Sequence, residues 1–455
     1  MGLTTPESPV SPATRSRTRP SSAALQLGER VRQLRIAAGW TQTELAGDRF
    51  SKEYVSQIER GKTRPTQGTI EWLAERLGAD PGFLASGVST DERSRVEAVL
   101  ARAEALSGAH RYPEAIEVFS DAYAAVLATG SPGLDVRALT GHAWARLQHG
   151  NLREALELLT RARGLTEDTS FTDLDRADVL FKLGVCRYKL SSISSSLGLL
   201  NEALALTERS DLTSDLLRAE IFGWRSRCYR RQRDFEAARE DVERALELAQ
   251  GLEDRRSLAN NFFQASLVAE RMGHWVQARN YAERAKALYE ELNDERNVAR
   301  LLIVSGGISL LLGKPDQAIE ALKASFRVAL EADSTEDAAQ AEGSLAAVHL
   351  QLGEHEQAEQ LARHALTLLE GRVDYLHETG QSEIVLGRAL MEQGRLDEAE
   401  ECFRTADQSF EQLASGSHRA GAWVALGDLA ARRGDDKTAA RLYRNAAETL
   451  QDVRF

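Results

Sequence analysis

From residue 95 onward the sequence repeats every 40 to 42 residues, and this repeat limits the possible folds more than any other feature. Each unit has a turn position that is often Gly, followed by small residues five and twelve positions later. The turn positions are His110, Gly150, Ser191, Arg233, Gly273, Gly313, Gly353, Gly394 and Gly434. Sixteen of the eighteen small residues are Ala, and the other two are Ser. Positions seven apart share one helix face, where small side chains let a neighbouring helix approach closely.

The proline distribution indicates that these units are helical. Residues 133–455 contain one proline, Pro315, and are rich in residues that favour helices, whereas a helix interior rejects proline. A second helical segment precedes each turn, so each unit is a helix pair, and stacked pairs bury the apolar faces that one pair leaves open. We therefore predict an all-α fold in which residues 95–455 form an α-solenoid of about nine helix pairs. This excludes sandwiches, barrels and parallel-sheet enzyme folds.

Charge is shared unevenly along the chain. Residues 1–87 contain 12 Lys and Arg against 9 Asp and Glu, which gives +3, whereas the whole chain carries −12 and the remainder therefore −15. Nucleic acid would bind the basic N-terminal region, because the acidic body repels phosphates. Residues 1–24 are rich in Ser, Thr, Pro and Arg. We expect a disordered arm there, either a solvated tail or an arm that enters a DNA minor groove.

Several classes of protein are excluded. The longest nearly apolar run, residues 301–312, is too short to cross a bilayer, and no apolar N-terminal stretch resembles a signal sequence. We expect a cytoplasmic protein without membrane contact. Cys186, Cys228 and Cys402 lack disulfide or zinc-site spacing, so we interpret them as small core residues. No pattern typical of a catalytic, phosphate-binding or metal site is present, and we predict no catalytic residue, no metal and no cofactor.

Residues 25–87 have apolar positions at helical spacing. Glycines interrupt this spacing at Gly39, Gly61 and Gly78. Thr41 starts a capping-box pattern with Glu44, and Ser51 is a second candidate N-cap. In the helix that follows Ser51, Val55 and Ile58 face inward. The side chains that are left to face a partner are Lys52, Glu53, Ser56 and Gln57.

This segment resembles the XRE family of phage-repressor-like helix-turn-helix domains. The matching residues are LR at 34–35, GWTQTELA at 39–46, YVSQIERGK at 54–62, Pro65 and LA at 73–74. In that family the helix that starts at the Ser51 position lies in the major groove, so the resemblance implies base contacts by Lys52, Glu53, Ser56 and Gln57. Their chemistry fits, since Gln pairs with adenine, Lys with guanine, and Glu accepts from cytosine.

The same resemblance implies a five-helix domain over residues 25–87 with further DNA contacts. Gln42 would contact a phosphate or an adjoining base, and three cations would contact phosphates: Arg60, Lys62 and Arg64. Arg35 and Glu59 would form a buried, structural ion pair. Residues 47–50 are one residue shorter than usual in the family, so the second helix or the turn is expected to be shortened.

The array resembles tetratricopeptide (TPR) repeats, with unusually long units, and is similar to the receptor domains of bacterial peptide-responsive (RRNPP-like) regulators. In TPR superhelices the first helix of each pair lines the concave groove. This implies a ligand groove that contains Tyr188, Arg227, Asn260, Phe263 and Arg300. Asparagine amides can hold a peptide backbone, and arginine can hold a carboxylate. The alternatives are that the polar groove residues are merely solvated and that the apolar ones belong to the core.

These features together favour a sequence-specific, DNA-binding transcriptional regulator rather than an enzyme. Its expected partners are double-stranded DNA and a peptide or protein in the TPR groove. Because one recognition helix covers few base pairs, we expect a homodimer on inverted half-sites. We place a linker at residues 88–94, between the DNA-binding domain and the array. The alternative function is a TPR interaction scaffold with a vestigial or accessory DNA-binding head.

Overall fold

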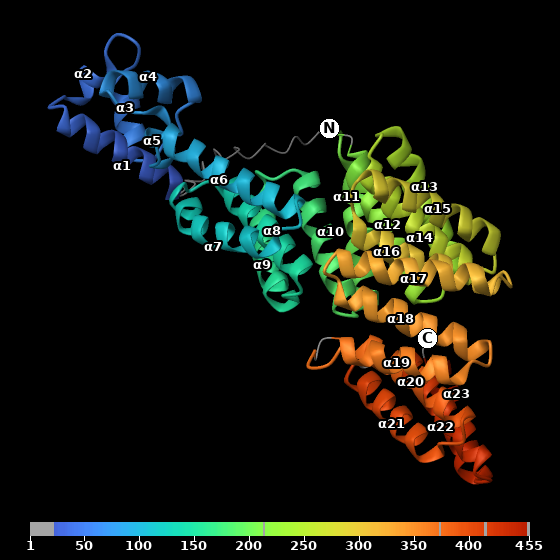
Figure 1. Ribbon diagram of the computed structural model, residues 1–455. Helices are drawn as coiled ribbons and strands as arrows, with labels where there is room; N and C mark the ends of the chain where they lie inside the picture. Colours follow the sequence, from blue (N-terminus) through green and yellow to red (C-terminus); the bar gives the residue numbers. More distant parts are fainter. Residues whose placement is uncertain (1–21, 213, 373–374, 414–415, 453–455) are drawn as a thin grey trace, which may run out of the picture. The chain divides into compact units, whose positions relative to one another are not determined.

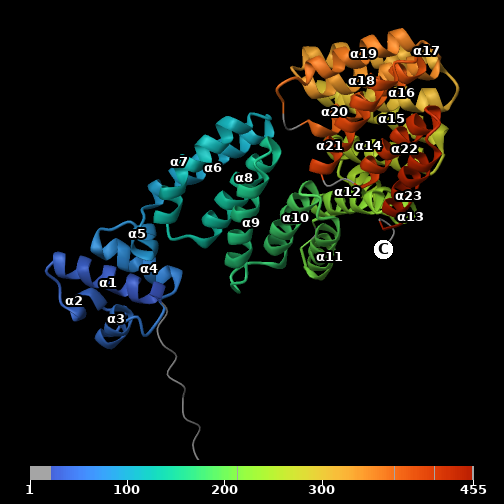
Figure 2. The same ribbon diagram turned by 90° about the horizontal axis from the view of Figure 1, so that it is seen from below.

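The computed structural model describes residues 22–212, 214–372, 375–413 and 416–452, and within these ranges it contains 23 α-helices and no strand. The all-α prediction is confirmed. Most of the predicted arm, residues 1–21, lies outside the described residues, whereas residues 22–24 belong to the first helix. Figures 1 and 2 show the chain from two sides.

The N-terminal domain consists of five helices, as predicted (Figure 1, dark blue to light blue). They are α1 (Ser22–Ala37), α2 (Gln42–Ala46), α3 (Lys52–Glu59), α4 (Gln67–Leu77) and α5 (Pro81–Ser86). Their apolar faces share one core, in which Val31, Leu45, Val55 and Leu73 are fully buried. The side chain of Arg30 ties α1 to the end of α5 by donating to the carbonyl oxygens of Leu84 and Ala85.

The remaining eighteen helices form nine pairs, which confirms the predicted solenoid (Figure 1, light blue to red). The pairs are α6 (Thr90–Gly108) with α7 (Tyr112–Ala128), α8 (Pro132–His149) with α9 (Leu152–Thr166), α10 (Asp173–Lys189) with α11 (Ile193–Arg209), α12 (Asp215–Arg231) with α13 (Phe235–Gly251), α14 (Arg255–Arg271) with α15 (Trp275–Glu291), α16 (Glu295–Leu311) with α17 (Pro315–Glu331), α18 (Thr335–Gln351) with α19 (His355–Leu368), α20 (Leu376–Glu392) with α21 (Leu396–Gln412), and α22 (Gly416–Arg432) with α23 (Asp436–Asp452).

The repeated sequence positions have a common structural cause. All nine turn positions have a left-handed backbone with φ between 59° and 101°, which explains why six of them are Gly. The eighteen small residues that follow are all buried, none more than 8% exposed. A further repeated contact lies seven residues before the turn, where a Cβ on Gly would come within 2.5 to 2.9 Å of a side chain on the second helix of the pair. These contacts are Gly184 with Leu200, Gly306 with Leu322, Gly387 with Phe403, and Gly427 with Tyr443.

The chain divides into two compact units. The first ends at Phe171 and combines the five-helix domain with α6 to α9, and the second begins at Thr172 and contains α10 to α23. Residues 88–94, expected to be a linker, are helical from Thr90 onward because Ser89 caps α6: its side chain accepts from the backbone N–H of Glu92. Within the second unit each pair packs against the next (Figure 2).

Among the residues that the structure describes, no helix has the length and apolar character needed to cross a membrane.

Candidate DNA-binding helix and candidate ligand-binding face

Both predicted N-caps around α2 and α3 are confirmed. Thr41 and Glu44 form a complete capping box at the start of α2, in which each side chain bonds the backbone of the other residue. The side chain of Ser51 accepts from the backbone N–H of Tyr54 at 3.1 Å and so fixes the start of α3. The helix α2 has only five residues and ends at Gly47, whose φ is 53°. This agrees with the shortening expected from the sequence.

The outward face of α3 carries the polar side chains that the sequence assigned to DNA. Lys52, Glu53 and Gln57 are exposed and Ser56 is half-buried, whereas Val55 and Ile58 on the opposite face are buried. Gln57 has one neighbour that the sequence analysis missed. The hydroxyl of Thr63, in the loop after α3, donates to Oε1 of Gln57 at 3.0 Å and orients its amide. Thr63 follows the YVSQIERGK motif directly, which is the only signal that could have identified it.

The predicted Arg35–Glu59 ion pair is confirmed and joins α1 to α3. Nε of Arg35 donates to Oε1 of Glu59 at 2.6 Å, and the two side chains are 12% and 4% exposed. The bond to Glu59 raises the pKa of the Arg35 guanidinium. Arg35 also donates to the carbonyl oxygen of Trp40 at 2.7 Å. One N–H of the Gln42 amide donates to Oε2 of Glu59 at 2.7 Å, so Gln42 is held beside α3 and keeps a second donor.

Exposed cations lie at the C-terminal end of this helix. Arg60, Lys62 and Arg64, the predicted phosphate contacts, are all exposed at and beyond the C-terminal end of α3.

The turn between α2 and α3 is anchored by aromatic packing, because the Phe50 ring lies 5.0 Å from that of Trp72, edge to face. This packing fixes where α3 begins, although residues 47–50 are fewer than the resemblance expects.

In the second unit, first helices of separate pairs direct charged side chains toward a common interior. Arg300 on α16 and Arg227 on α12 both lower the pKa of Lys189 on α10, after burial, which is the larger cause. Arg231 on α12 likewise lowers the pKa of His377 on α20, again after burial. The pairs that contain α10 and α16 are not neighbours in the sequence, and neither are those that contain α12 and α20. We call the surface to which these side chains belong the inner face. It is formed by the first helices of the pairs in the second unit: α10, α12, α14, α16, α18, α20 and α22.

The predicted ligand residues lie on the helices of the inner face, and most are held by neighbours. Oδ1 of Asn260 accepts from the hydroxyl of Tyr289 at 2.6 Å. Arg300 pairs with the buried Asp337 at 2.8 Å. Phe263 is half-buried and packs against the apolar core, which favours the core interpretation of this residue.

Arg227 and Tyr188 are placed differently, since aromatic rings and not carboxylates surround them. The Arg227 guanidinium lies 4.1 Å from the ring centre of Trp224, and the Tyr188 ring lies 5.5 Å from the same indole. Arg231 lies 5.4 Å from the ring centre of Tyr188. Trp224 was not predicted from the sequence, because it stands outside the positions that the TPR resemblance marks.

The inner face also carries acidic groups toward the N-terminal ends of its helices. Glu220 on α12 is exposed, yet the surrounding helices raise the pKa of its carboxyl to about 7, first by desolvation and then through the charge of Asp178 on α10. Lys182 lowers this pKa and Asp254 raises it further. The face is therefore electrostatically divided, with carboxylates at one end of α12 and arginines at the other.

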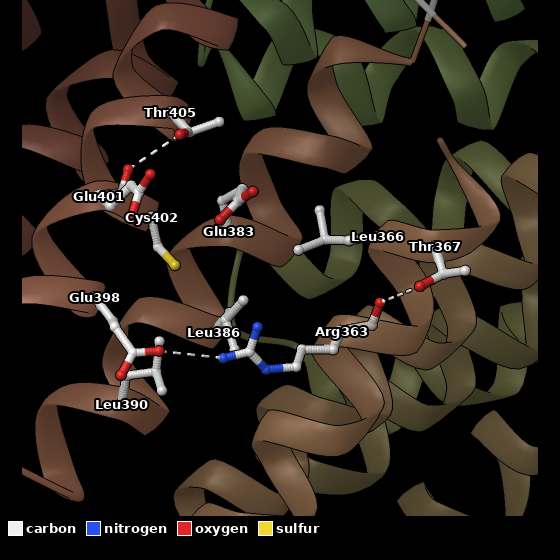
Figure 3. Close-up of a pocket in the computed structure, with 10 residues that line it drawn as sticks. All are labelled: Arg363, Leu366, Thr367, Glu383, Leu386, Leu390, Glu398, Glu401, Cys402 and Thr405. Atoms are coloured by element: carbon white, nitrogen blue, oxygen red, sulfur yellow. Dashed lines mark hydrogen bonds and ion pairs between the residues drawn. The ribbon is translucent and has the colours of Figure 1, made fainter. Parts of the chain in front are cut away.

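A cavity of about 450 Å³ lies between α19, α20 and α21, apart from the predicted residues (Figure 3). Arg363 reaches toward Glu398, with Nη2 and Oε2 separated by 3.6 Å. Burial, followed by the neighbouring Glu383, raises the pKa of the Cys402 thiol to about 12. The thiol is thus protonated at neutral pH and is a poor nucleophile.

The other two cysteines are buried core residues. Burial raises the pKa of both the Cys186 and Cys228 thiols, and Sγ of Cys228 lies 3.3 Å from Oγ of Ser196. Their burial agrees with the interpretation from the sequence. In the part of the chain that the structure describes, no group of three or more His, Cys, Asp and Glu side chains is arranged to hold a metal ion.

Comparison with protein-family models identifies a helix-turn-helix domain at residues 26–86. Tetratricopeptide repeat models match residues 140–211, 217–291, 297–371 and 384–452. No curated protein sequence matches the chain. The two resemblances stated from the sequence, a helix-turn-helix segment and a TPR array, are therefore confirmed.

Solved structures share the helical-repeat fold. The apo form of the quorum sensor NprR from B. thuringiensis matches with a TM-score of 0.59 at 12% identity, covering 79% of this chain and 99% of that one. NprR in complex with its cognate peptide NprX matches with a TM-score of 0.51 at 13% identity, covering 68% and 88%. A Rap protein complexed with competence and sporulation factor matches with a TM-score of 0.54 at 15% identity, covering 79% and 98%.

Proposed function

We propose that this protein, which combines a helix-turn-helix domain with tetratricopeptide repeats, is a sequence-specific transcriptional regulator whose repeats sense a peptide. The observation that carries the proposal is the construction of α3. The Ser51 cap fixes the start of α3, and the buried Arg35–Glu59 pair ties the helix to α1. The opposite face presents Lys52, Glu53 and Gln57 to solvent. A rigid helix with exposed hydrogen-bonding side chains suits the reading of base edges in a major groove.

The exposed cations around α3 support the same proposal. Arg60, Lys62 and Arg64 would bind phosphates and position α3 without reading sequence. Gln42, held against Glu59, would use its second N–H for a phosphate or an adjoining base. Because one helix of this length spans few base pairs, the regulator would act as a homodimer on inverted half-sites about one DNA turn apart.

The sensing role rests on the inner face of the second unit. Asn260 and Arg227 project from adjacent first helices, and Arg300 lies close enough to Arg227 for both to act on Lys189. Together with Tyr188 and Phe263 they would bind an extended peptide, the amide engaging its backbone and the arginines its carboxylates. NprR, which shares the repeat fold, has been solved with a peptide, and the Rap protein with competence and sporulation factor.

A peptide would regulate DNA binding only if it binds one conformation of the array more tightly than another. Stacked repeats suit such a mechanism, because small changes at each interface between pairs add up to a change in curvature. We therefore expect the protein to act by binding and not by catalysis. We expect it to do so in the cytoplasm.

The DNA-binding proposal can be tested by titrating the full-length protein onto its own promoter region at several salt concentrations. Gln57→Ala should remove the preference for specific over random DNA. Lys62→Ala should weaken binding to both DNAs and lower the salt slope by about one. Gln67→Ala is the matched control, since Gln67 is also exposed but lies on α4. A wild-type protein that binds specific and random DNA equally would contradict the proposal and favour an interaction scaffold.

The sensing proposal can be tested by calorimetry with fractionated secreted peptides. Asn260→Ala should weaken binding about tenfold, the effect of losing one to two hydrogen bonds. Asn280→Ala is the control, because Asn280 is an exposed asparagine on α15, the second helix of the same pair. If active fractions bind both variants equally well, the inner face is not the peptide site, although the DNA-binding proposal would stand.

A further inference from the structure

Two half-buried arginines of α12 have no carboxylate partner among the described residues. Nε of Arg227 and Nε of Arg230 are each enclosed by protein and form no hydrogen bond within the described residues. Burial lowers the pKa of both guanidinium groups. Enclosing a cation without a counter-charge costs several kcal/mol in real proteins, so such groups are rarely left unpaired.

The same helix shows that this chain can neutralise a buried arginine. Arg225, two residues before Arg227, forms two hydrogen bonds of 2.6 Å with the carboxylate of Asp241, and the two side chains are 13% and 4% exposed. This pair links α12 to its partner helix α13. Arg225 is thus structural, whereas Arg227 and Arg230 point to the inner face without a matching carboxylate.

Further cations surround these two arginines. After burial, Arg231 and Arg271 lie near enough to Arg230 to lower its pKa further, whereas Tyr188 and Glu270 raise it. Lys189, Arg231 and Arg271 all occupy the position two residues before a turn, in three successive units. We call Lys189, Arg227, Arg230, Arg231 and Arg271 the basic cluster. Its cations come from three helices, α10, α12 and α14.

Histidines extend the cluster without neutralising it. His377 on α20 and His418 on α22 are stacked edge to face with their ring centres 4.5 Å apart. Burial lowers the pKa of His418 to about 4, and Arg231 and Arg271 contribute to the shift. Both rings are therefore neutral at pH 7. The histidines add no charge, and the cluster keeps its positive charge.

We propose that the basic cluster binds a carboxylate group of the peptide ligand and makes the array selective for acidic peptides. The inference rests on the proposed sensing function and specifies its ligand class. A carboxylate facing Arg227 and Arg230 would neutralise the two guanidinium groups, in the geometry that arginine offers to carboxylates. Arg300 would contribute less to this selectivity, because its Nε already pairs with Asp337 and only its remaining N–H groups could contact the ligand.

The test uses short peptides as probes on the full-length protein at constant ionic strength. Tetraglutamate with an amidated C-terminus should bind at least tenfold more tightly than tetraglutamine with the same ends, as expected for one charge-assisted bidentate contact. Tetraglutamine with a free C-terminus separates a terminal carboxylate from side-chain carboxylates, and tighter binding of either acid supports the proposal. Inorganic phosphate should bind more weakly than tetraglutamate. Equal binding of glutamate and glutamine peptides, or a preference for phosphate, would overturn it.

A variant of Arg227 separates ligand binding from a structural role. Arg227→Met should reduce the preference for glutamate to less than about threefold, while the melting temperature without peptide stays the same or rises, since an uncompensated charge is removed. Arg444→Met, which changes an exposed arginine on α23, should alter neither property. A lower melting temperature for Arg227→Met would show that Arg227 is structural and would refute the proposal. Circular dichroism and a second variant, Arg230→Gln, guard against a misfolded protein.

The result can be distinguished from failure of the proposed function. Selective binding of acidic peptides that leaves DNA binding unchanged would retain the basic cluster and reject peptide-controlled regulation. Control of DNA binding by neutral or basic peptides alone would do the reverse.

Discussion

Two adjacent glycines in α16 should respond to alanine substitution in opposite directions. Gly306 and Gly307 both lie in the interior of this helix, so either substitution gains the same helix propensity, about 0.5–1 kcal/mol. Their surroundings differ. A Cβ on Gly306 would lie 2.8 Å from Cγ and 3.0 Å from Cδ2 of Leu322 on α17, whereas a Cβ on Gly307 would meet no atom within 4 Å.

The magnitude follows from these distances. Carbon atoms in contact prefer a separation of about 3.5–4.0 Å. Leu322 is only 1% exposed, so its side chain cannot move into solvent, and overpacking of this kind costs about 1–3 kcal/mol. Gly307→Ala should therefore stabilise the α16–α17 helix pair by somewhat under about 1 kcal/mol. Gly306→Ala should destabilise it by about 1 kcal/mol, a difference of about 2 kcal/mol between neighbouring residues.

Hydrogen exchange of α16 and α17 is the appropriate assay, because a repeat array need not unfold in one cooperative step. A difference of about 2 kcal/mol corresponds to about 30-fold in the opening equilibrium. Amides of these two helices should exchange faster in Gly306→Ala and slower in Gly307→Ala than in the wild type. Equal protection in the two variants would refute the claim that the glycine seven residues before the turn is required for close packing.

Three further predictions concern the recognition helix and the inner face. Glu59→Ala leaves Arg35 buried without its partner and should destabilise α1–α3 by about 3 kcal/mol or more, measured by hydrogen exchange; unchanged protection would contradict a structural ion pair. Ser51→Ala removes the bond to the backbone of Tyr54 and should cost about 1 kcal/mol in the same assay, with loss confined to α3. The carboxyl pKa of Glu220 rises from 4.5 to about 7 on folding, so the folded chain binds more protons between these values and loses stability as pH increases through them. Glu220→Gln should abolish this part of the pH dependence of the melting temperature, and an unchanged profile would show that the carboxyl titrates normally.

Much of the fold could be predicted because its causes are local and repeated. A left-handed turn position favours Gly, and close helix contacts require Ala, so both appear in the sequence at a fixed period. The caps at Thr41 and Ser51 were predictable for the same reason, since each acts within three residues of itself. Residues 88–94, where we expected a linker, are helical from Thr90 onward, because Ser89 supplies a cap for a stretch that has little apolar periodicity.

The inner face was only partly predictable, because its contacts join residues far apart in the sequence. The TPR resemblance marks both Arg227 and Arg300 as groove residues, yet Asp337 pairs with Arg300 and no carboxylate among the described residues pairs with Arg227. No periodic pattern contains that difference, since it depends on which side chain stands opposite in space. Lys189, Arg231 and Arg271 stand two residues before successive turns, and this spacing is visible in the sequence. That they belong to one cluster depends on distances in space, which place Arg271 close enough to lower the pKa of Arg230.

A buried charge that the fold leaves unpaired offers a route from ligand to conformation. An anion that neutralises Arg227 and Arg230 stabilises the conformations in which these groups are enclosed, by an amount set by its concentration relative to its dissociation constant. Conformations in which water fully solvates the same groups gain less from the anion. The ligand therefore has a different affinity for the two sets, which is the condition for a shift in population. A groove whose arginines were all paired, as Arg225 is with Asp241, would bind a peptide without this bias.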